Sequence, residues 1–457
     1  MDAAVDNKAR KKHPPGLYLL FLTEMWERFS YYGMRAILVL YLTTSFVSGG
    51  LGFSDSYAMM LYGFFTGAVY ITPMVGGYLS DRFLGQRRAI TIGGITMAVG
   101  NIVLFAHQSA GALYLGLILL IIGNGFFKPN ISTIVGELYE NNDPRRDAAF
   151  TIFYMGINVG AFFSPLLIGY LYNDLFKTTT LDGIIQYGFK YGFLAAAIGM
   201  VIGQLIFNLL GNRYLGDIGK KPTGAPDRSV DAQAKNKPLT KKEKQRTTVI
   251  IILTCFVIFF WAGFEQAGSS LTLYTERFVD RQIFGWEIPT AWFQSVNPVF
   301  IVLLAPLFSM LWVKLASSKR GDIKVPSKMG IGMVLLGLGY MILLIAVMKT
   351  GSDEANIQVK ANIMFIVLTY LMHTMGELML SPVGLSLVSR IAPVKLASLL
   401  MGVWLAASGI ANILAGQLAA FTQTLGYFEI FGLIGLMAIV LGFILLSFSR
   451  KLVQMMD

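Results

Sequence analysis

Residues 24–35 of the chain read E-M-W-E-R-F-S-Y-Y-G-M-R, and they place four charged side chains inside an apolar segment of helix length. A charge at membrane depth costs roughly 2.5 to 3.5 kcal/mol on insertion scales, so a membrane helix that retains four is expected to use them. With about 100° of rotation per residue, an arc of about 100° on one face contains Glu24, Glu27, Arg28, Tyr31 and Arg35. This face predicts the wall of an internal cavity, away from lipid.

The composition is typical of a polytopic membrane protein rather than a soluble enzyme. Of 457 residues, 55% are apolar, 14% are charged and 48 are glycine. The net charge of +11 comes from Lys and Arg in short polar connections and not from one basic face, which argues against a nucleic-acid partner. One cysteine, Cys255, allows neither a disulfide framework nor a thiolate metal site, and we expect it to pack within its apolar helix.

Twelve apolar segments are long enough to cross a bilayer, which takes about 20 residues. They lie near residues 16–47, 55–79, 87–107, 112–138, 147–172, 188–210, 247–273, 291–315, 327–348, 360–390, 397–422 and 426–449. Connections rich in Lys and Arg follow every second segment, so the positive-inside rule places both termini in the cytoplasm. The sequence therefore predicts an all-α membrane protein with twelve transmembrane helices.

The longest polar stretch, residues 211–246, separates six apolar segments from six. It predicts a flexible, charged cytoplasmic linker between two six-helix bundles, residues 16–210 and 247–450. Short cytoplasmic ends, 1–15 and 451–457, complete the chain. This layout is that of the major facilitator fold, in which the substrate site lies near the membrane midplane between the halves, but other folds also have twelve helices.

The connection between the second and third segments reads G-G-Y-L-S-D-R-F-L-G-Q-R-R, residues 76–88. Gly77 would let two helices approach closely, while Asp81 and Arg82 can bond to a neighbouring helix end or side chain. Such contacts would latch the cytoplasmic side in one state, so the motif predicts a gate. The alternative is an ordinary basic loop.

Three further charges fall inside later apolar segments: Lys128, Glu265 and Glu377. Together with the first segment they give an apparent interior of four carboxylates (Glu24, Glu27, Glu265, Glu377) and three cations (Arg28, Arg35, Lys128). A buried carboxylate without a cation is expected to take up a proton, so the excess negative charge predicts a proton carrier. Two alternatives stay open: an unseen partner or water for one Glu, and a purely structural ion-pair network around Glu24 and Arg28.

Six motifs, in order along residues 16–449, resemble those of the proton-dependent oligopeptide transporters, the POT family. They are E-x-x-E-R-F-x-Y-Y-G, D-R-x-L-G, K-P-N, F-T-I-F-Y-M-G-I-N-V-G, F-E-Q and G-E-L-M-L-S-P-V-G-L. The resemblance implies proton-coupled symport of di- and tripeptides into the cell by alternating access. Residues 211–246 are too polar for the two extra helices of many bacterial relatives, which leaves a twelve-helix version.

The resemblance also implies roles for single residues. Arg35 and Lys128 would accept the peptide carboxylate, and Glu377 would meet the peptide amino group. The peptide cavity would be lined by Tyr32, Tyr70, Asn158, Asn297, Ser381 and Trp404. For each of these six, and for Tyr70 and Trp404 above all, plain packing is the alternative.

Proton coupling is implied in the same way. Glu265 and Arg35 resemble an ion pair that spans the two bundles, while Glu24, Glu27 and Arg28 resemble a network shared with Lys128. The second segment has no histidine, so protonation would rest on carboxylates. We interpret His373, four residues before Glu377, as a packing or hydrogen-bonding side chain.

Two rival functions remain at this point. A transporter of the same fold could carry nitrate, other small anions or drug-like molecules, although Glu377 and an intact E-x-x-E-R favour a substrate with a free amine. A membrane enzyme or receptor has little support, because the sequence has no nucleophile triad, metal-ligand cluster or nucleotide loop. We therefore expect no enzyme activity and no cofactor beyond protons, in a functional monomer that contacts lipids of a bacterial cytoplasmic membrane.

Overall fold

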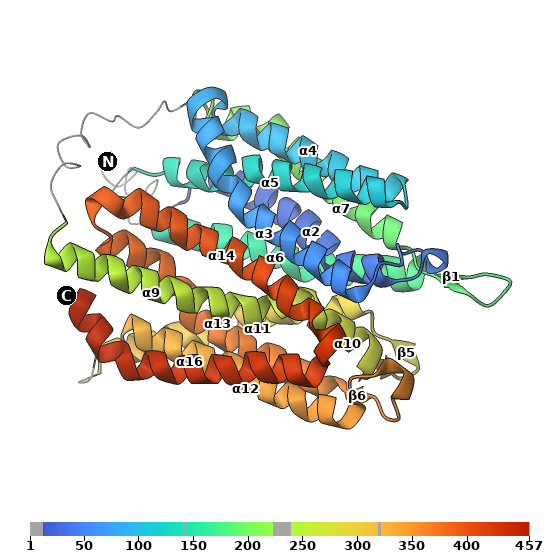
Figure 1. The fold of residues 1–457 in the computed structure, drawn as a ribbon. Coiled ribbons are helices and arrows are strands. Elements are labelled where there is room, and N and C mark those ends of the chain that lie inside the picture. The colour runs from blue at the N-terminus through green and yellow to red at the C-terminus, as the bar shows by residue number, and fades with distance from the viewer. Residues whose placement is uncertain (1–11, 141–142, 144, 223–238, 319–320, 457) are drawn as a thin grey trace. The chain divides into compact units, whose positions relative to one another are not determined.

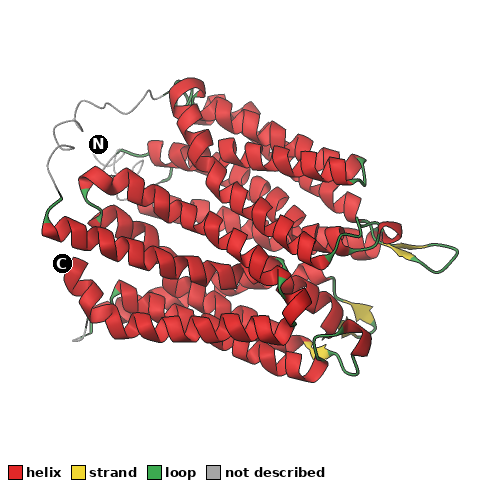
Figure 2. Ribbon diagram, viewed as in Figure 1, coloured by secondary structure: helices red, strands yellow, loops and turns green. Residues whose placement is uncertain are grey.

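The computed structural model describes residues 12–140, 143, 145–222, 239–318 and 321–456, most of which lie in helices (Figure 2). The predicted all-α membrane architecture is confirmed. In the described residues the long helices (Figure 1) are α2 (Pro15–Thr43), α3 (Asp55–Leu79), α4 (Gln86–Ala106), α5 (Ala110–Glu137), α6 (Arg146–Tyr170), α7 (Phe189–Leu215), α9 (Lys241–Phe264), α11 (Val296–Ala316), α12 (Val325–Thr350), α13 (Ile363–Ile391), α14 (Ala397–Ala420) and α16 (Tyr427–Met456).

Short turns and strands connect these helices. The one-turn segments are η1 (Phe46–Ser48), η2 (Ser80–Leu84), η3 (Leu171–Leu175), η4 (Glu265–Gly268), η5 (Thr290–Ser295), η6 (Glu354–Asn356) and η7 (Val394–Leu396), with two short helices α10 (Ser270–Phe278) and α15 (Thr422–Leu425). Two antiparallel pairs join β1 (Thr178–Thr179) to β2 (Ile185–Gln186) and β4 (Gln282–Ile283) to β5 (Trp286–Glu287). One parallel pair joins β3 (Val279–Asp280) to β6 (Ala361–Asn362).

Eleven helical segments of the described residues are long and apolar enough to cross a membrane. The remaining long helix, α2, has 29 residues, which at about 1.5 Å per residue is also long enough, but it carries the charges of residues 24–35. The seventh predicted segment is interrupted: α9 ends at Phe264, η4 follows, and α10 begins at Ser270. The chain is therefore an integral membrane protein with many spans.

The chain divides into two compact units, which we describe separately. The first comprises Met1–Ile37 and Thr72–Pro226, and the second comprises Leu38–Ile71 and Asp227–Asp457. The predicted boundaries of the two bundles and the linker stay a prediction. At its ends the predicted linker is helical, since α7 continues to Leu215 and α9 begins at Lys241. Residues 223–238 of the linker lie outside the described residues. The same holds for residues 1–11, 141–142, 144 and 457.

In the first unit, α4 packs against α5 and α7. The α4–α5 contact is close because glycines meet: a Cβ atom on Gly123 would lie 2.6 Å from the carbonyl oxygen of Gly93. Glycine at such crossings lets helix backbones approach where hydrophobic burial alone does not drive association. The high glycine content of the sequence therefore serves helix packing.

In the second unit, α12 packs against α13 and α16, and α9 packs against α14 and α16. Part of α3 belongs to this unit because it meets α14 glycine to glycine: a Cβ atom on Gly63 would lie 2.6 Å from the Cα atom of Gly416. The expectation that Cys255 packs inside was wrong, since this side chain is exposed on α9. An apolar thiol is tolerated there because the surface of a membrane helix faces lipid.

Candidate functional site

Three of the four charges on α2 form one buried cluster. The Nε atom of Arg28 lies 3.2 Å from Oε1 of Glu24 and also donates to Oε2 of Glu27. All three residues are at most 2% exposed. One guanidinium therefore serves two carboxylates in a site from which water is largely excluded.

Helix α5 completes this cluster with an amide and a cation. The Nδ2 atom of Asn124 donates to Oε1 of Glu27 at 3.3 Å, and Lys128, one turn further along, lies close enough to act electrostatically on Glu24. Among the described residues, Oε2 of Glu24 and Nη2 of Arg28 are buried without a hydrogen-bond partner. Most buried polar atoms in proteins are paired, so these two atoms leave the cluster with unused hydrogen-bonding capacity.

Glycines of α6 and α7 allow this charged helix to be buried. A Cβ atom on Gly160 of α6 would lie 2.3 Å from the carbonyl oxygen of Met25 and 3.0 Å from Cβ of Arg28. On the α7 side, a Cβ atom on Gly203 would lie 2.9 Å from Cβ of Trp26. The motif F-T-I-F-Y-M-G-I-N-V-G thus contains a glycine whose absent side chain makes room for the charged turn of α2.

We expect Gly160→Ala to destabilise the protein by about 1–3 kcal/mol, because the added methyl group overpacks the contact with α2. The shift in apparent melting temperature of the detergent-purified protein measures this effect. Gly111→Ala is the matched control, since a Cβ atom there meets nothing within 4 Å. Equal melting temperatures for the two variants would contradict the close approach of α2 and α6.

Arg35 lies almost two turns beyond Arg28 on α2 and is 7% exposed. Its guanidinium lies 5.9 Å from the ring centroid of Tyr32, and that of Arg28 lies 5.3 Å from the ring centroid of Tyr31. The two tyrosine rings meet edge to face at 5.4 Å. Cation–π contacts and ring packing therefore hold both arginines in defined positions on one face of α2.

In the second unit, Glu377 of α13 is held by α11. The Nδ2 atom of Asn297 donates to Oε2 of Glu377 at 2.8 Å and lies 3.0 Å from the hydroxyl of Thr374. Glu377 is 8% exposed. The structure thus brings together two predicted site residues, Asn297 and Glu377, and adds Thr374, which the sequence did not single out.

Glu265 begins the interruption between α9 and α10 and is 6% exposed. The break is fixed by the next residue: Nε2 of Gln266 donates to the carbonyl oxygens of Ala262 and Ala415, at 3.1 and 3.0 Å. Glu265 also acts electrostatically on Glu377. Interrupted membrane helices are typical of transporter binding sites, and two buried carboxylates here give the second unit a negative pole.

Arg35 and Glu265 belong to different units, so their predicted pairing stays a prediction.

The other residues that were predicted to line the peptide cavity lie in different surroundings. Tyr70 of α3 is partly buried, Asn158 of α6 donates to the carbonyl oxygen of Tyr154 in its own helix, and Trp404 of α14 lies in the apolar core of the second unit. For Trp404 this core position fits the packing alternative. Ser381 lies on α13, and its side chain is outside the described residues.

His373 is buried between aromatic rings, with ring centroids of Tyr340 and Phe264 at 4.8 and 6.3 Å. It also makes a hydrogen bond to the backbone of Leu336. These contacts fit the packing or hydrogen-bonding role that we expected of it.

The predicted gating motif ends α3 in a π-helical turn, η2. A Cβ atom on Gly77 would make ordinary contact with Pro129 at 3.5 Å, and Arg82 donates to the hydroxyl of Tyr78 at 2.7 Å. Ser80 of this turn donates to Asn130, the asparagine of the K-P-N motif on α5. Two motifs that are separate in sequence therefore meet, while the gating role of Gly77, Asp81 and Arg82 stays a prediction.

The ion pair between Arg277 and Asp55 was not predicted from the sequence. Arg277 of α10 forms a bidentate ion pair with Asp55, the first residue of α3, with N–O distances of 2.5 and 2.8 Å. The Nε atom of Arg277 also lies 3.4 Å from Glu354. Arg277 and Glu354 border a polar cavity of about 270 Å³. Asp55 and Arg277 are 222 residues apart, so no local sequence pattern could reveal the pair. The available signal was that each charge lies at the end of an apolar segment, Asp55 at the start of α3 and Arg277 in the last turn of α10.

Comparison with known proteins agrees with these features. The POT family model matches residues 87–230 and 225–434. The chain is 34% identical to the peptide transporter YePEPT of Yersinia enterocolitica over 90% of this chain and 88% of the relative, and 31% identical to a di-/tripeptide transporter of Lactococcus lactis over 98% of both.

Among solved structures, a mutant of peptide transporter POT in complex with alafosfalin matches with a TM-score of 0.86 and 33% identity, covering 97% of this chain and 96% of that one. The sequence matches extend over nearly the whole chain, and the structural match covers the same range. The chain therefore belongs to the POT family of membrane transporters.

Proposed function

We propose that this POT-family protein is a proton-coupled symporter of di- and tripeptides that works by alternating access. The observation that carries the proposal is a separation of charge between the two units. The first unit carries the cations Arg28, Arg35 and Lys128 together with Glu24 and Glu27, whereas the second carries Glu265 and Glu377 as buried acids. A zwitterionic peptide needs one positive and one negative pole, with polar groups between them for its backbone.

In this proposal Arg35 and Lys128 bind the peptide carboxylate, and Glu377 binds the peptide amino group. Asn297 orients Glu377, since its amide already donates to the carboxylate. Tyr32, Tyr70, Asn158, Ser381 and Trp404 are the further proposed cavity residues. Peptides of two or three residues are the proposed substrates because two relatives are named as peptide transporters, one of them for di- and tripeptides.

Proton coupling is proposed to run through the carboxylates. Protonation of Glu265 would release Arg35 for the peptide, and protonation within the Glu24–Glu27–Arg28 cluster would change the hold on Lys128. A ligand shifts a conformational equilibrium only when it binds the two states differently. Proton and peptide would then favour the same state.

The orientation is proposed from the charge pattern. Lys and Arg in alternate connections place both termini in the cytoplasm of a bacterial cell, and the contact of Asp55 with Arg277 then lies on the outer side. This bidentate ion pair joins α3 to α10, so we propose that it stabilises the state that is closed to the outside. In the same way, the 76–88 motif would stabilise the state that is closed to the cytoplasm.

The substrate assignment is tested with Glu377→Gln, which removes the charge but keeps an oxygen for Asn297. Hydrogen bonds to charged groups contribute about 1.5–3 kcal/mol, so half-inhibition of peptide counterflow by dialanine should need at least about tenfold more dialanine. Inhibition by N-acetyl-dialanine, which has no free amine, should not change. Equal losses for both peptides would refute the role of Glu377. Inhibition of the wild type by nitrate and not by dialanine would favour an anion transporter instead.

A further inference from the structure

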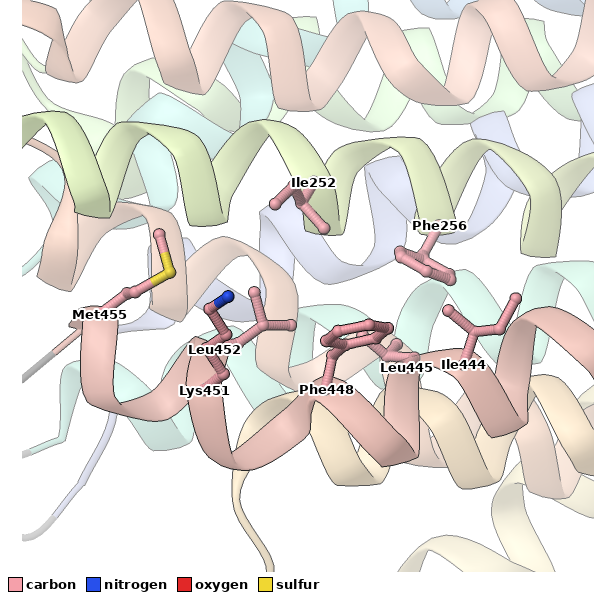
Figure 3. Close-up of a pocket in the computed structure, with 8 residues that line it drawn as sticks. All are labelled: Ile252, Phe256, Ile444, Leu445, Phe448, Lys451, Leu452 and Met455. Atoms are coloured by element: carbon pink, nitrogen blue, oxygen red, sulfur yellow. The ribbon is translucent and has the colours of Figure 1, made fainter.

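An apolar groove runs between α9 and α16 on the second unit, with a volume of about 410 Å³ (Figure 3). It is lined by Ile252 and Phe256 of α9 and by six residues of α16 between Ile444 and Met455. All of the lining side chains are apolar except one, Lys451. None of these residues belongs to the proposed peptide or proton sites.

The groove has a closed floor and an open rim. Leu445 and Leu452 form the floor and are 1% and 5% exposed, whereas Ile444 and Phe448 on the rim are 41% and 55% exposed. Both helices are long and apolar enough to cross a membrane, so the exposed rim faces lipid and not water. The occupant of this groove is therefore drawn from the bilayer.

The length of the groove matches one leaflet. The lining residues of α16 extend from Ile444 to Met455, eleven steps along the helix, which at 1.5 Å each span about 16 Å. The hydrocarbon layer of a bilayer is about 30 Å thick, so one leaflet supplies about 15 Å. One acyl chain lying along α16 therefore matches the groove in length.

The polar end of the groove is positively charged. Figure 3 shows the Lys451 ammonium group turned toward α9, near the end of α16. At the same end, Nε of Arg246 donates to the carbonyl oxygen of Met456 at 2.8 Å, which ties the start of α9 to the end of α16. The first turns of α9 also carry Lys241, Lys242 and Lys244.

The acid among these first residues of α9, Glu243, is engaged with the helix start. It accepts hydrogen bonds from the backbone and the hydroxyl of Thr240, at 2.8 and 2.9 Å. The cations around the groove end therefore outnumber the acid in the described residues. Lys and Arg near the membrane surface attract anionic lipid headgroups, and a long Lys side chain can reach the headgroup level from an apolar wall.

We propose that the α9–α16 groove binds one acyl chain of an anionic phospholipid, with Lys451 pairing with its phosphate group. In the proposed orientation this lipid belongs to the cytoplasmic leaflet. A neutral alkyl chain or a second copy of the protein would fill the apolar part, but neither accounts for the cation turned into its polar end.

Native mass spectrometry of the full-length protein, purified in detergent and titrated with lipid, tests the headgroup. The probes are phosphatidylglycerol and phosphatidylcholine with identical acyl chains. One Lys near the surface contributes about 1 kcal/mol, so the wild type should retain the anionic lipid at about fivefold lower concentration. Lys451→Gln should lose this preference, whereas Arg450→Gln, an equal change of charge at a position outside the groove lining, should keep it.

A second pair of variants tests the groove. Ile444→Trp fills it and should reduce retention of both lipids, whereas Phe443→Trp, on the neighbouring exposed position, should not. Melting temperatures show whether the variants are folded. Equal retention of both lipids by the wild type would overturn the proposal, as would matching behaviour of Lys451→Gln and Arg450→Gln. Dimers that form without lipid and are abolished by Ile444→Trp would assign the groove to a second copy instead.

Discussion

Glu265→Gln is expected to retain peptide exchange and to lose accumulation driven by a proton gradient. The carboxylate lies at the interruption between α9 and α10 and is 6% exposed, so glutamine preserves its size and polarity while removing its capacity to carry a proton. Each pH unit supplies about 1.4 kcal/mol per proton, enough for about tenfold accumulation of peptide. The variant should instead stop at equal concentrations on both sides.

The experiment uses proteoliposomes loaded with unlabelled dialanine for exchange, and empty ones with an inward proton gradient for accumulation. Glu429→Gln is the matched control, because it makes the same change at an exposed position in the first turn of α16. The control should accumulate peptide like the wild type. Normal accumulation by Glu265→Gln would move proton coupling to another carboxylate.

Arg28→Leu is expected to have the largest effect on stability. It would leave Glu24 and Glu27 buried without the guanidinium that now contacts both. Removing one partner of a buried ion pair typically costs about 3–5 kcal/mol, because the remaining charge stays uncompensated. The apparent melting temperature of the purified protein should fall, whereas Arg213→Leu, at an exposed position near the end of α7, should change it little.

A triple variant separates charge from packing. Replacing Glu24 and Glu27 by glutamine together with Arg28→Leu removes all three charges, so it should recover most of the lost stability. It should still fail to transport, because the proposed link to Lys128 is gone. If Arg28→Leu alone were as stable as the wild type, the buried cluster would not contribute to the stability of the fold. If the triple variant transported normally, the cluster would have no role in coupling.

The fold could be predicted from the sequence because a bilayer demands about 20 apolar residues for each crossing. All twelve predicted segments correspond to helices, with ends that differ by a few residues. The two helices that flank the predicted linker extend into it, because a helix can continue into polar residues beyond the membrane. Helix α7 ends at Leu215, and α9 begins at Lys241. The interruption at Glu265 was not predicted, because hydrogen bonds from Gln266 to two carbonyl oxygens define it, and one of these belongs to Ala415, far along the chain.

The candidate site was predictable where one helix carries it. Glu24, Glu27 and Arg28 share a face of α2, and helical periodicity alone brings them together. Two uncharged partners were missed: Asn124 of α5, which donates to Glu27, and Thr374 of α13, which lies 3.0 Å from Asn297. The Asp55–Arg277 pair was missed for another reason: which ends of two helices meet is decided by packing, such as the contact of Gly63 with Gly416, and not by local pattern.

Proton-coupled peptide uptake is tested most directly by purified wild-type protein in sealed liposomes supplied with labelled dialanine. We predict accumulation above the external concentration under an inward proton gradient, and its collapse when a protonophore dissipates the gradient. Without a gradient, the peptide should only equilibrate. Accumulation that is equal with and without the gradient would contradict coupling to protons, and the absence of dialanine uptake under both conditions would contradict peptide transport itself.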